Sequence, residues 1–288
     1  MERRTFLGLL GAGALAAGTA CGGRSEHPPE PQGLPVVPLG RTGLQTTLLG
    51  MGTGYQGYGG SSAIVRAGVA EALIRQAYER GLRYFDCADT YGTHPYAADA
   101  LRGQPRGSYL LATKIWVMPG MDAVQTVERF LRELKTDYLD LVQLHAQSDG
   151  AWTQSYRPIM DQLASLKARQ LIRAHGASIH SLAALEAALD PWVDVVHCRI
   201  NPFGVSMDDP DPARVAAVLA RLHAAGKGLI GMKLLGAGAY RDDPSRIDEA
   251  LRFVLGLSTV DMVVVGFERP DQIDDYLTRV GRARILAG

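Results

Sequence analysis

One stretch of the chain shows its organisation most clearly: Gly81-Leu82-Arg83-Tyr84-Phe85-Asp86-Cys87-Ala88-Asp89-Thr90-Tyr91-Gly92. A glycine suited to ending a helix leads into a short, largely apolar run, and a polar loop follows. Asp86 ends the core of that run, and Tyr91 follows in the loop. This order predicts a buried strand whose carboxyl end presents polar side chains.

The same pattern recurs along the chain at intervals typical of alternating strands and helices. Near-continuous apolar runs such as Met262-Val263-Val264-Val265 suit strands that are buried on both faces of a parallel sheet. The eight candidate strands are Leu48–Gly52, Arg83–Ala88, Tyr109–Ile115, Tyr138–His145, Arg173–Ser178, Val193–Ile200, Gly228–Leu235 and Asp261–Phe267.

The segments between these strands have helical spacing and helical end signals. Val127, Leu131 and Leu134, for example, share one helical face. Asp211-Pro212 and Asp243-Pro244 place a capping residue directly before a proline suited to a first turn. Gly81 and Gly226 are expected to close two of the helices.

Eight strand–helix units in about 240 residues predict a closed (β/α)8 barrel, the TIM-barrel fold. A doubly wound open sheet is the alternative, but no Gly-x-Gly-x-x-Gly fingerprint opens a first helix. Residues Leu34 to Thr47, with Gly40 and Gly43 as turn residues, are expected to form an N-terminal β-hairpin that caps the barrel floor.

Composition supports one globular domain. The chain has 288 residues, 47% of them hydrophobic, and 30 basic side chains balance 30 acidic ones. The zero formal net charge gives no indication of nucleic-acid binding. Cys87 and Cys198 fall inside predicted strands, where burial as small apolar side chains is the expected role.

The N-terminus predicts export from a bacterial cytoplasm. Residues 1–21 combine Arg3-Arg4 with an apolar stretch too short to span a bilayer, which indicates a twin-arginine signal or an ordinary secretory signal. Cys21 is either a lipid attachment site or the residue after simple cleavage. Residues 22–34 read as a flexible linker, and 35–288 as the barrel. We therefore expect a periplasmic protein or a membrane-anchored lipoprotein.

Four polar residues at or just beyond strand ends predict the chemistry. Asp86, Tyr91, Lys114 and His145 would meet at one rim of the barrel. A carbonyl carbon accepts a hydride readily only if its oxygen is protonated or strongly hydrogen-bonded. A tyrosine can supply that proton, a nearby ammonium lowers the phenol pKa, and a carboxylate holds the ammonium. An imidazole can orient the oxygen, and a nicotinamide cofactor must supply the hydride.

Each of these residues also has an ordinary structural explanation. A strand-end Asp or Lys often forms a structural ion pair, and a lone Tyr or His is often a packed core residue. The functional interpretation depends on all four residues lying on neighbouring strands. No compact metal-ligand spacing such as His-Glu-x-x-His accompanies them, so we expect no metal and disfavour a metal hydrolase or isomerase on the same barrel.

The segment from Gly81 to Gly92 resembles the signature of the aldo-keto reductases. Leu39-Gly40-Arg41-Thr42-Gly43-Leu44, Ala112-Thr113-Lys114 and Asp137-Tyr138-Leu139-Asp140-Leu141 through His145 are similar to further motifs of that family, in the same order. The resemblance covers roughly Leu39 to the C-terminus. It implies the barrel, Tyr91 as the acid assisted by Asp86, Lys114 and His145, and a nicotinamide nucleotide without metal or flavin.

The resemblance also implies a cofactor site. It comprises Gly52, Thr53, Ser178, His197, Met232, Lys233, Gly236, Gly266, Arg269, Gln272 and Asp275. Ser178 would contact the nicotinamide amide, although Ile179 replaces the usual Asn beside it. His197 stands where Gln is common, and Met232 where a Tyr often stacks on the ring. An ordinary barrel-filling role is the alternative for these positions.

The last strand–helix unit resembles the segment that holds the adenosine half of the nucleotide. Arg269 could bind a 2′-phosphate, but Glu268 and Asp271 lie close by, and Tyr276 replaces the usual Asn. We therefore expect NADP, with NAD as a serious competitor.

The expected substrate is a small carbonyl or alcohol compound: an aldehyde, a ketone or a sugar. Tyr55, Trp116 and Trp152 are predicted to form the pocket walls. A second hypothesis is a reductase-like barrel that has lost turnover and serves as a nucleotide-dependent binding or regulatory protein. The changes at Ile179, His197 and Tyr276 motivate it. The chain is expected to be a monomer or a small homo-oligomer.

Overall fold

A computed structural model describes residues 33–287, and the side chains of 284–287 are excluded from the description. The expected signal in residues 1–21 and nearly all of the expected linker lie outside the described residues. None of the described helices combines the length and the apolarity that crossing a membrane requires.

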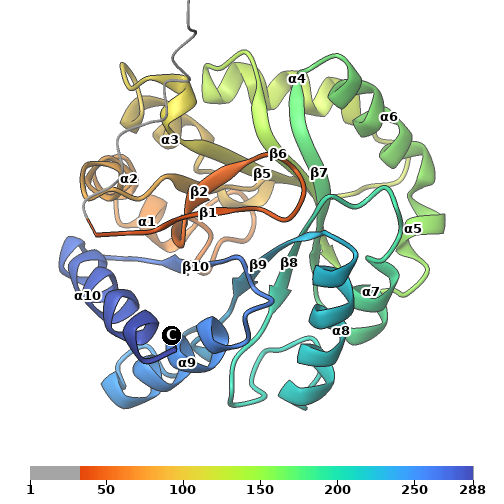
Figure 1. The fold of residues 1–288 in the computed structure, drawn as a ribbon. Coiled ribbons are helices and arrows are strands. Elements are labelled where there is room, and N and C mark those ends of the chain that lie inside the picture. Colours follow the sequence, from red (N-terminus) through yellow and green to blue (C-terminus); the bar gives the residue numbers. More distant parts are fainter. Residues whose placement is uncertain (1–32, 288) are drawn as a thin grey trace, which may run out of the picture.

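Eight parallel strands close into a barrel in the order β10-β3-β4-β5-β6-β7-β8-β9, so the predicted fold is confirmed. Figure 1 shows the helices surrounding the strands. The barrel strands are β3 (Leu49–Gly52), β4 (Tyr84–Asp86), β5 (Leu110–Ile115), β6 (Leu139–Gln147), β7 (Ile172–Ile179), β8 (Val195–Arg199), β9 (Gly228–Met232) and β10 (Met262–Gly266).

The helices follow the strands in sequence. They are α1 (Ala63–Arg66), α2 (Ala70–Glu79), α3 (His94–Ala100), α4 (Ala123–Leu134), α5 (Trp152–Ser155), α6 (Arg157–Ala168), α7 (Leu182–Ala187), α8 (Pro212–Ala224), α9 (Pro244–Gly256) and α10 (Pro270–Ala287). The predicted caps form: Asp211 accepts the amide N–H of Ala213, and Asp243 accepts those of Ser245 and Arg246. These bonds satisfy amide groups that a helix start leaves without partners.

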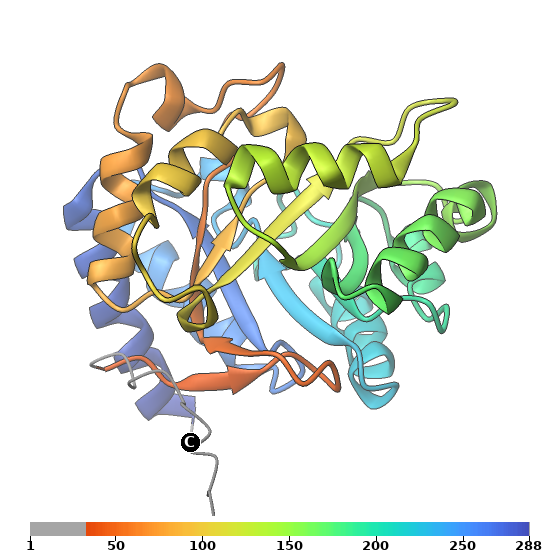
Figure 2. The ribbon, with the colours of Figure 1, turned by 90° about the horizontal axis from the view of Figure 1, so that it is seen from above.

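The expected N-terminal hairpin also forms. β1 (Val36–Pro38) pairs antiparallel with β2 (Gln45–Thr47), and Figures 1 and 2 show the pair lying across one end of the barrel. Leu39 and Leu44 from its turn are buried among inward-facing side chains of the strands. The hairpin closes the amino-terminal end, which leaves the carboxyl ends of the strands as the open mouth.

Gly40 fixes the hairpin against the barrel. Its φ is +49°, and a Cβ placed there would lie 2.4 Å from the amide nitrogen of Gly228. Its own N–H donates to Asp261 at 3.0 Å. Only glycine allows both this backbone conformation and this close approach.

Both cysteines that the structure describes, Cys87 and Cys198, are buried and free, as expected. The strand containing His145 differs from the prediction, because it runs past His145 to Gln147 with a register shift between Leu144 and Gln147. Ala146, at φ +57°, lies within this irregular stretch.

Candidate active site

Asp86 and Lys114 form a buried ion pair at the barrel mouth. They lie on adjacent strands, β4 and β5, and only 6% of Asp86 and 1% of Lys114 is exposed. The Lys114 ammonium donates to Asp86 Oδ1 and, at 3.0 Å, to the carbonyl oxygen of Cys87. Burial lowers the pKa of Lys114, but Asp86 and Tyr91 raise it, and the net direction is upward. Lys114 therefore remains a cation at neutral pH.

Tyr91 lies next to this pair. It belongs to a short 3-10 turn, Asp89–Tyr91, which ends at Gly92 with φ +68°. The Lys114 ammonium is 5.2 Å from the centre of the Tyr91 ring. The ring packs so closely on Gly54 that a Cβ added there would approach it to 2.2 Å. A glycine at position 54 is therefore required for this placement of the phenol.

The pKa of Tyr91 differs from the sequence-based expectation of an acidified phenol. Burial raises the pKa of Tyr91, the Lys114 charge lowers it, and the net direction is upward. Tyr91 is therefore held as the protonated phenol at neutral pH, which is the form that can donate a proton. Lys114 opposes the effect of burial, so it stabilises the phenolate that remains after the proton leaves.

His145 is the second polar group beside the phenol. Its Nε2 lies 3.4 Å from Tyr91 Oη, and its ring meets the Tyr91 ring edge to face. Burial and, to a smaller extent, the charge of Lys114 lower the pKa of His145 to about 3. The imidazole is therefore neutral and can donate one hydrogen bond without carrying charge. Its Nδ1 is buried without a hydrogen-bond partner among the described residues.

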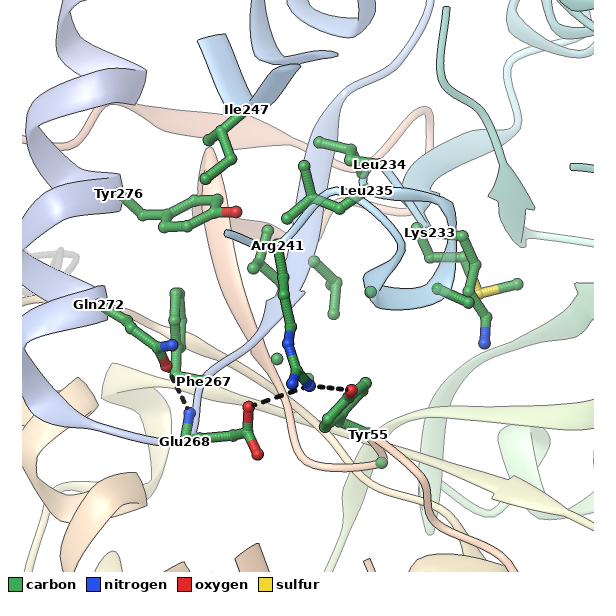
Figure 3. A pocket seen from close by; sticks show the side chains of 18 of the residues that line it. Tyr55, Lys233, Leu234, Leu235, Arg241, Ile247, Phe267, Glu268, Gln272 and Tyr276 are labelled. Carbon is green, nitrogen blue, oxygen red and sulfur yellow. Dashed lines mark hydrogen bonds and ion pairs between the residues drawn. The ribbon is translucent and has the colours of Figure 1, made fainter. Parts of the chain in front are cut away.

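A cavity of about 560 Å³ runs from these residues across the mouth toward β10 and α10. Asp86 and Tyr91 line one end, and Gln272 and Tyr276 line the other. In Figure 3 Arg241 crosses this cavity toward Tyr55 and Glu268. Arg241 donates to the Tyr55 hydroxyl and lies 3.8 Å from the Glu268 carboxylate.

The structure brings most of the predicted nucleotide residues to this cavity. Its walls include Gly52, Met232, Lys233, Gly266, Arg269, Gln272 and Asp275. Tyr55, predicted as a substrate wall, also lines it. Trp116 is 42% exposed and meets the His145 ring edge to face at 5.6 Å, so it too lies beside the candidate catalytic groups.

Four predicted cofactor residues are not among the cavity-lining residues. Thr53 is buried behind the wall, where its hydroxyl donates to the Asp86 carbonyl at 2.8 Å. The Ser178 hydroxyl accepts the N–H of Ala146 at 2.8 Å. The amide of Gly236, a buried residue, donates to the Lys233 carbonyl at 2.9 Å. His197 is completely buried inside the barrel. The hydrogen bonds of Thr53, Ser178 and Gly236 hold the backbone next to the cavity in place.

His197 belongs to a buried polar network beneath the catalytic pair. Gln143 donates its amide hydrogens to the carbonyl oxygens of Ala177 and Val195, at 3.1 and 3.3 Å. Its own oxygen must therefore accept from His197 Nδ1, which fixes the tautomer. The other nitrogen, Nε2, lies 3.4 Å from the Tyr84 hydroxyl and 3.6 Å from Asp86 Oδ1.

The placement of Trp152 corrects the prediction that it forms a pocket wall. Trp152 is 0% exposed, packs in the hydrophobic core, and donates its indole N–H to the carbonyl of Ala184 at 3.0 Å. The reason is the short helix α5, which begins at this residue and turns its side chain inward beneath α7. The sequence analysis does not identify Arg241 or Gln143 as site residues. Arg241 lies in an irregular loop and Gln143 is a single glutamine in an apolar strand, and neither pattern forms a recognisable motif.

The size and lining of the cavity suit a nicotinamide dinucleotide. Ligand pockets commonly enclose 300–1,000 Å³. A reactive ring placed beside Tyr91 would leave the rest of an extended dinucleotide to occupy the remainder of the cavity, where Arg241 and Arg269 supply donors for phosphate oxygens. Met232 offers an apolar surface at the catalytic end. Within residues 33–287, no group of three or more His, Cys, Asp or Glu side chains could hold a metal ion.

The family model that matches the chain is that of the aldo/keto reductase family, over residues 49–249. The chain therefore belongs to the aldo/keto reductase family, whose members are generally NAD(P)H-dependent carbonyl reductases.

Curated relatives agree with this assignment, and a solved structure shares the fold. The chain is 29% identical over 142 residues to the methylglyoxal reductase DkgB of Salmonella typhi, covering 48% of this chain and about half, 52%, of that protein. It is 26% identical to aldo-keto reductase family 1 member A1 of Pongo abelii, over 74% of this chain and 70% of the relative. An aldo-keto reductase structure from Pseudomonas aeruginosa has the same fold, with a TM-score of 0.71 and 23% identity over 86% of this chain and 96% of that one.

Proposed function

We propose that the protein is a carbonyl reductase, or the corresponding alcohol dehydrogenase in the reverse direction, with Tyr91 as its general acid and base. One observation carries the proposal: a protonated phenol, a neutral imidazole and a buried ammonium–carboxylate pair lie together at a cavity of about 560 Å³.

The side chains divide the work as follows. Tyr91 donates its proton to the carbonyl oxygen, and His145 orients that oxygen by a hydrogen bond from Nε2. Lys114 stabilises the phenolate that forms, and Asp86 holds Lys114 in position. When bound, reduced nicotinamide supplies the hydride to the carbonyl carbon, which gives the alcohol and the oxidised nucleotide.

The nucleotide preference depends on the far end of the cavity. Arg269 is paired with Asp271 at 3.1 Å, and Arg279 with Asp275 at 2.7 Å. These carboxylates compete with a 2′-phosphate for the same donors. We propose that the protein accepts both nucleotides, with NADP(H) preferred over NAD(H) by no more than about tenfold, since the guanidinium of Arg269 is shared with a carboxylate.

A panel of aldehydes tests the proposal, with methylglyoxal first because relatives carry that activity in their names. Consumption of NADPH and NADH is measured for the native protein, for Tyr91→Phe, and for the matched control Tyr58→Phe, whose side chain is 83% exposed. We expect Tyr91→Phe to lose about 10²- to 10⁴-fold in rate and Tyr58→Phe to lose nothing. Equal rates for Tyr91→Phe and the native protein would remove Tyr91 from its role.

The second candidate is a nucleotide-dependent binding protein without turnover. It is favoured by one observation, the burial of His197 away from the cavity, which leaves fewer polar groups for the nicotinamide amide. A thermal shift with NADPH or NADH, combined with an absence of reduction across the whole panel, would support it, because selective binding stabilises the fold without requiring chemistry.

We also propose that the protein is exported, either to the periplasm or as a lipoprotein anchored through Cys21. Because twin-arginine export carries folded proteins, the nucleotide would travel bound. Purified mature protein should then show nucleotide absorbance. Protein that carries no nucleotide and binds added nucleotide weakly would count against a travelling cofactor.

A further inference from the structure

We propose that the preferred carbonyl substrate carries an anionic group, a carboxylate or its equivalent, which binds a set of basic residues at the ends of four neighbouring strands. This inference rests on the proposed function and names the substrate class for that same site. The four residues, called the basic arc below, are His145, His180, Arg199 and Lys233.

The strand register brings the basic arc together. Ser178 on β7 pairs with His197 on β8, so His180 lies level with Arg199. Arg199 in turn pairs with Met232 on β9, and Lys233 is the next residue. Residues two apart in a strand face the same side. Because His197 faces the barrel interior, Arg199 also faces inward, at the mouth. His145 on β6 completes the arc beside Tyr91.

Within the described part of the chain, one carboxylate, that of Asp208, forms an ion pair with a member of the basic arc. Arg199 pairs with Asp208, through Nε at 2.7 Å and its own amide N–H at 3.1 Å. Lys233 is exposed at the cavity wall. The surrounding protein partly desolvates the Lys233 amine, and this desolvation and the repulsion of Arg199 and Lys114 lower its pKa. The pKa of His180 is also lowered, to about 4, by burial and by the positive charges of Arg199 and Lys233.

At neutral pH the two histidines of the basic arc are uncharged, so Arg199 and Lys233 carry its positive charge, and an anion bound between them would relieve their mutual repulsion. Charge-assisted bonds from an ammonium or guanidinium to a carboxylate are among the strongest polar contacts in proteins. The basic arc therefore offers a place for the anionic end of a substrate whose carbonyl oxygen lies at Tyr91 and His145.

The position of Lys233 distinguishes substrate from nucleotide. Figure 3 shows Lys233 on the opposite side of the cavity from Gln272 and Tyr276. The guanidinium that lies over the middle of the cavity is that of Arg241. A dinucleotide running from Tyr91 toward Gln272 would leave the Lys233 amine facing the substrate side. Binding of the nucleotide diphosphate by Lys233 is the competing explanation.

The test compares two substrates that differ only in charge, 4-carboxybenzaldehyde and its methyl ester. We expect the native enzyme to have at least about tenfold higher kcat/KM for the carboxylate at low ionic strength, and this ratio to fall as salt rises. Lys233→Gln should bring the ratio close to one. The matched control Lys135→Gln, on an exposed lysine that is not among the residues lining this cavity, should keep the native ratio.

Binding provides a readout without turnover. We expect benzoate to bind the enzyme–NADP⁺ complex at least about tenfold more tightly than benzamide, and Lys233→Gln to abolish the difference; the Kd for NADPH is measured for both proteins alongside. A native ratio near one, or a ratio that survives Lys233→Gln, would overturn the inference. So would a Lys233→Gln variant that loses NADPH affinity and keeps its carboxylate preference.

The two proposals fail separately. If no aldehyde is reduced, the proposed function fails, and the benzoate comparison still tests the basic arc. If the neutral ester is reduced as well as the carboxylate, the proposed function stands and the inference about charge fails.

Discussion

Removing the Lys114 ammonium is the perturbation whose consequences the structure defines best. Lys114→Met keeps most of the side-chain volume but deletes the donor to Asp86 and to the Cys87 carbonyl. Asp86, only 6% exposed, would then be a buried carboxylate without its cation. Breaking a buried ion pair by removing one partner costs about 3–5 kcal/mol.

Thermal and urea unfolding measure this loss. For a domain of this size, 1 kcal/mol corresponds to roughly 2–4 °C in Tm, so we expect Tm to fall by about 6–20 °C. The double variant Asp86→Leu with Lys114→Met replaces both charges by apolar groups, and it should recover most of the lost stability.

Activity separates the structural role of the pair from its catalytic role. We expect both the single and the double variant to lose carbonyl reduction by about 10²-fold or more, because the phenolate of Tyr91 is no longer stabilised. A double variant as unstable as Lys114→Met would refute the account of the buried charge. A stable double variant with native activity would refute the assignment of Lys114 and Asp86 to catalysis.

Three further predictions concern pH, the buried network and the nucleotide. Burial lowers the pKa of His145 to about 3, the pKa of His175 and His180 to about 4, and the pKa of His197 well below its ordinary value, so the native protein holds fewer protons than the unfolded chain, and stability is lost as pH falls below about 6.5. His145, His175 and His180 each withdraw about 2 kcal/mol by pH 5, and His197 adds to this loss, while burial, which raises the pKa of Asp208 to about 7, makes that carboxyl group stabilise the fold on acidification by about 2 kcal/mol; urea titrations at pH 7 and pH 5 should therefore show a net loss of at least about 4 kcal/mol, and unchanged stability would contradict this reasoning. Gln143→Leu leaves the Ala177 and Val195 carbonyls and His197 Nδ1 without their partner, which should lower the free energy of unfolding by about 1–3 kcal/mol in the same assay; a neutral effect would mean that these bonds are replaced. Arg269→Ala should weaken NADPH binding by about three- to tenfold and leave NADH binding unchanged in fluorescence titrations, because only the former carries a 2′-phosphate; equal losses would remove Arg269 from that role.

The sequence predicts the barrel well because its strands are more continuously apolar than the segments between them. A strand buried on both faces needs a nearly continuous apolar run, such as Met262-Val263-Val264-Val265. The start of a helix can be recognised from its capping residue, as at Asp243. The hairpin follows from its two turn glycines. These signals are local, so no knowledge of the tertiary structure is required to find them.

The grouping of Asp86, Tyr91, Lys114 and His145 could also be predicted, because parallel strands bring their carboxyl ends to one rim. How deeply a side chain lies within the barrel could not be predicted from the sequence. His197 and Trp152 are aromatic residues near strand ends, yet each is fully buried. Whether such a side chain reaches the mouth depends on strand register and on the helix that follows.

The net effect of burial and nearby charges on a pKa also could not be predicted from the sequence. Tyr91 was expected to be acidified by Lys114, but burial outweighs the nearby charge and the pKa of Tyr91 rises. The basic arc was not recognised because its members are distant in sequence. They come together only when β6, β7, β8 and β9 lie side by side.

The most direct test of the central claim follows deuterium from the nucleotide to the product. The native enzyme is mixed with an aldehyde and with reduced nicotinamide nucleotide that carries deuterium at the transferred C4 position, and the alcohol is analysed by mass spectrometry. We predict one deuterium per molecule of alcohol for the native enzyme and only trace product for Tyr91→Phe with the same bound nucleotide. Unlabelled alcohol from the native enzyme, or equal labelling by Tyr91→Phe, would contradict the account.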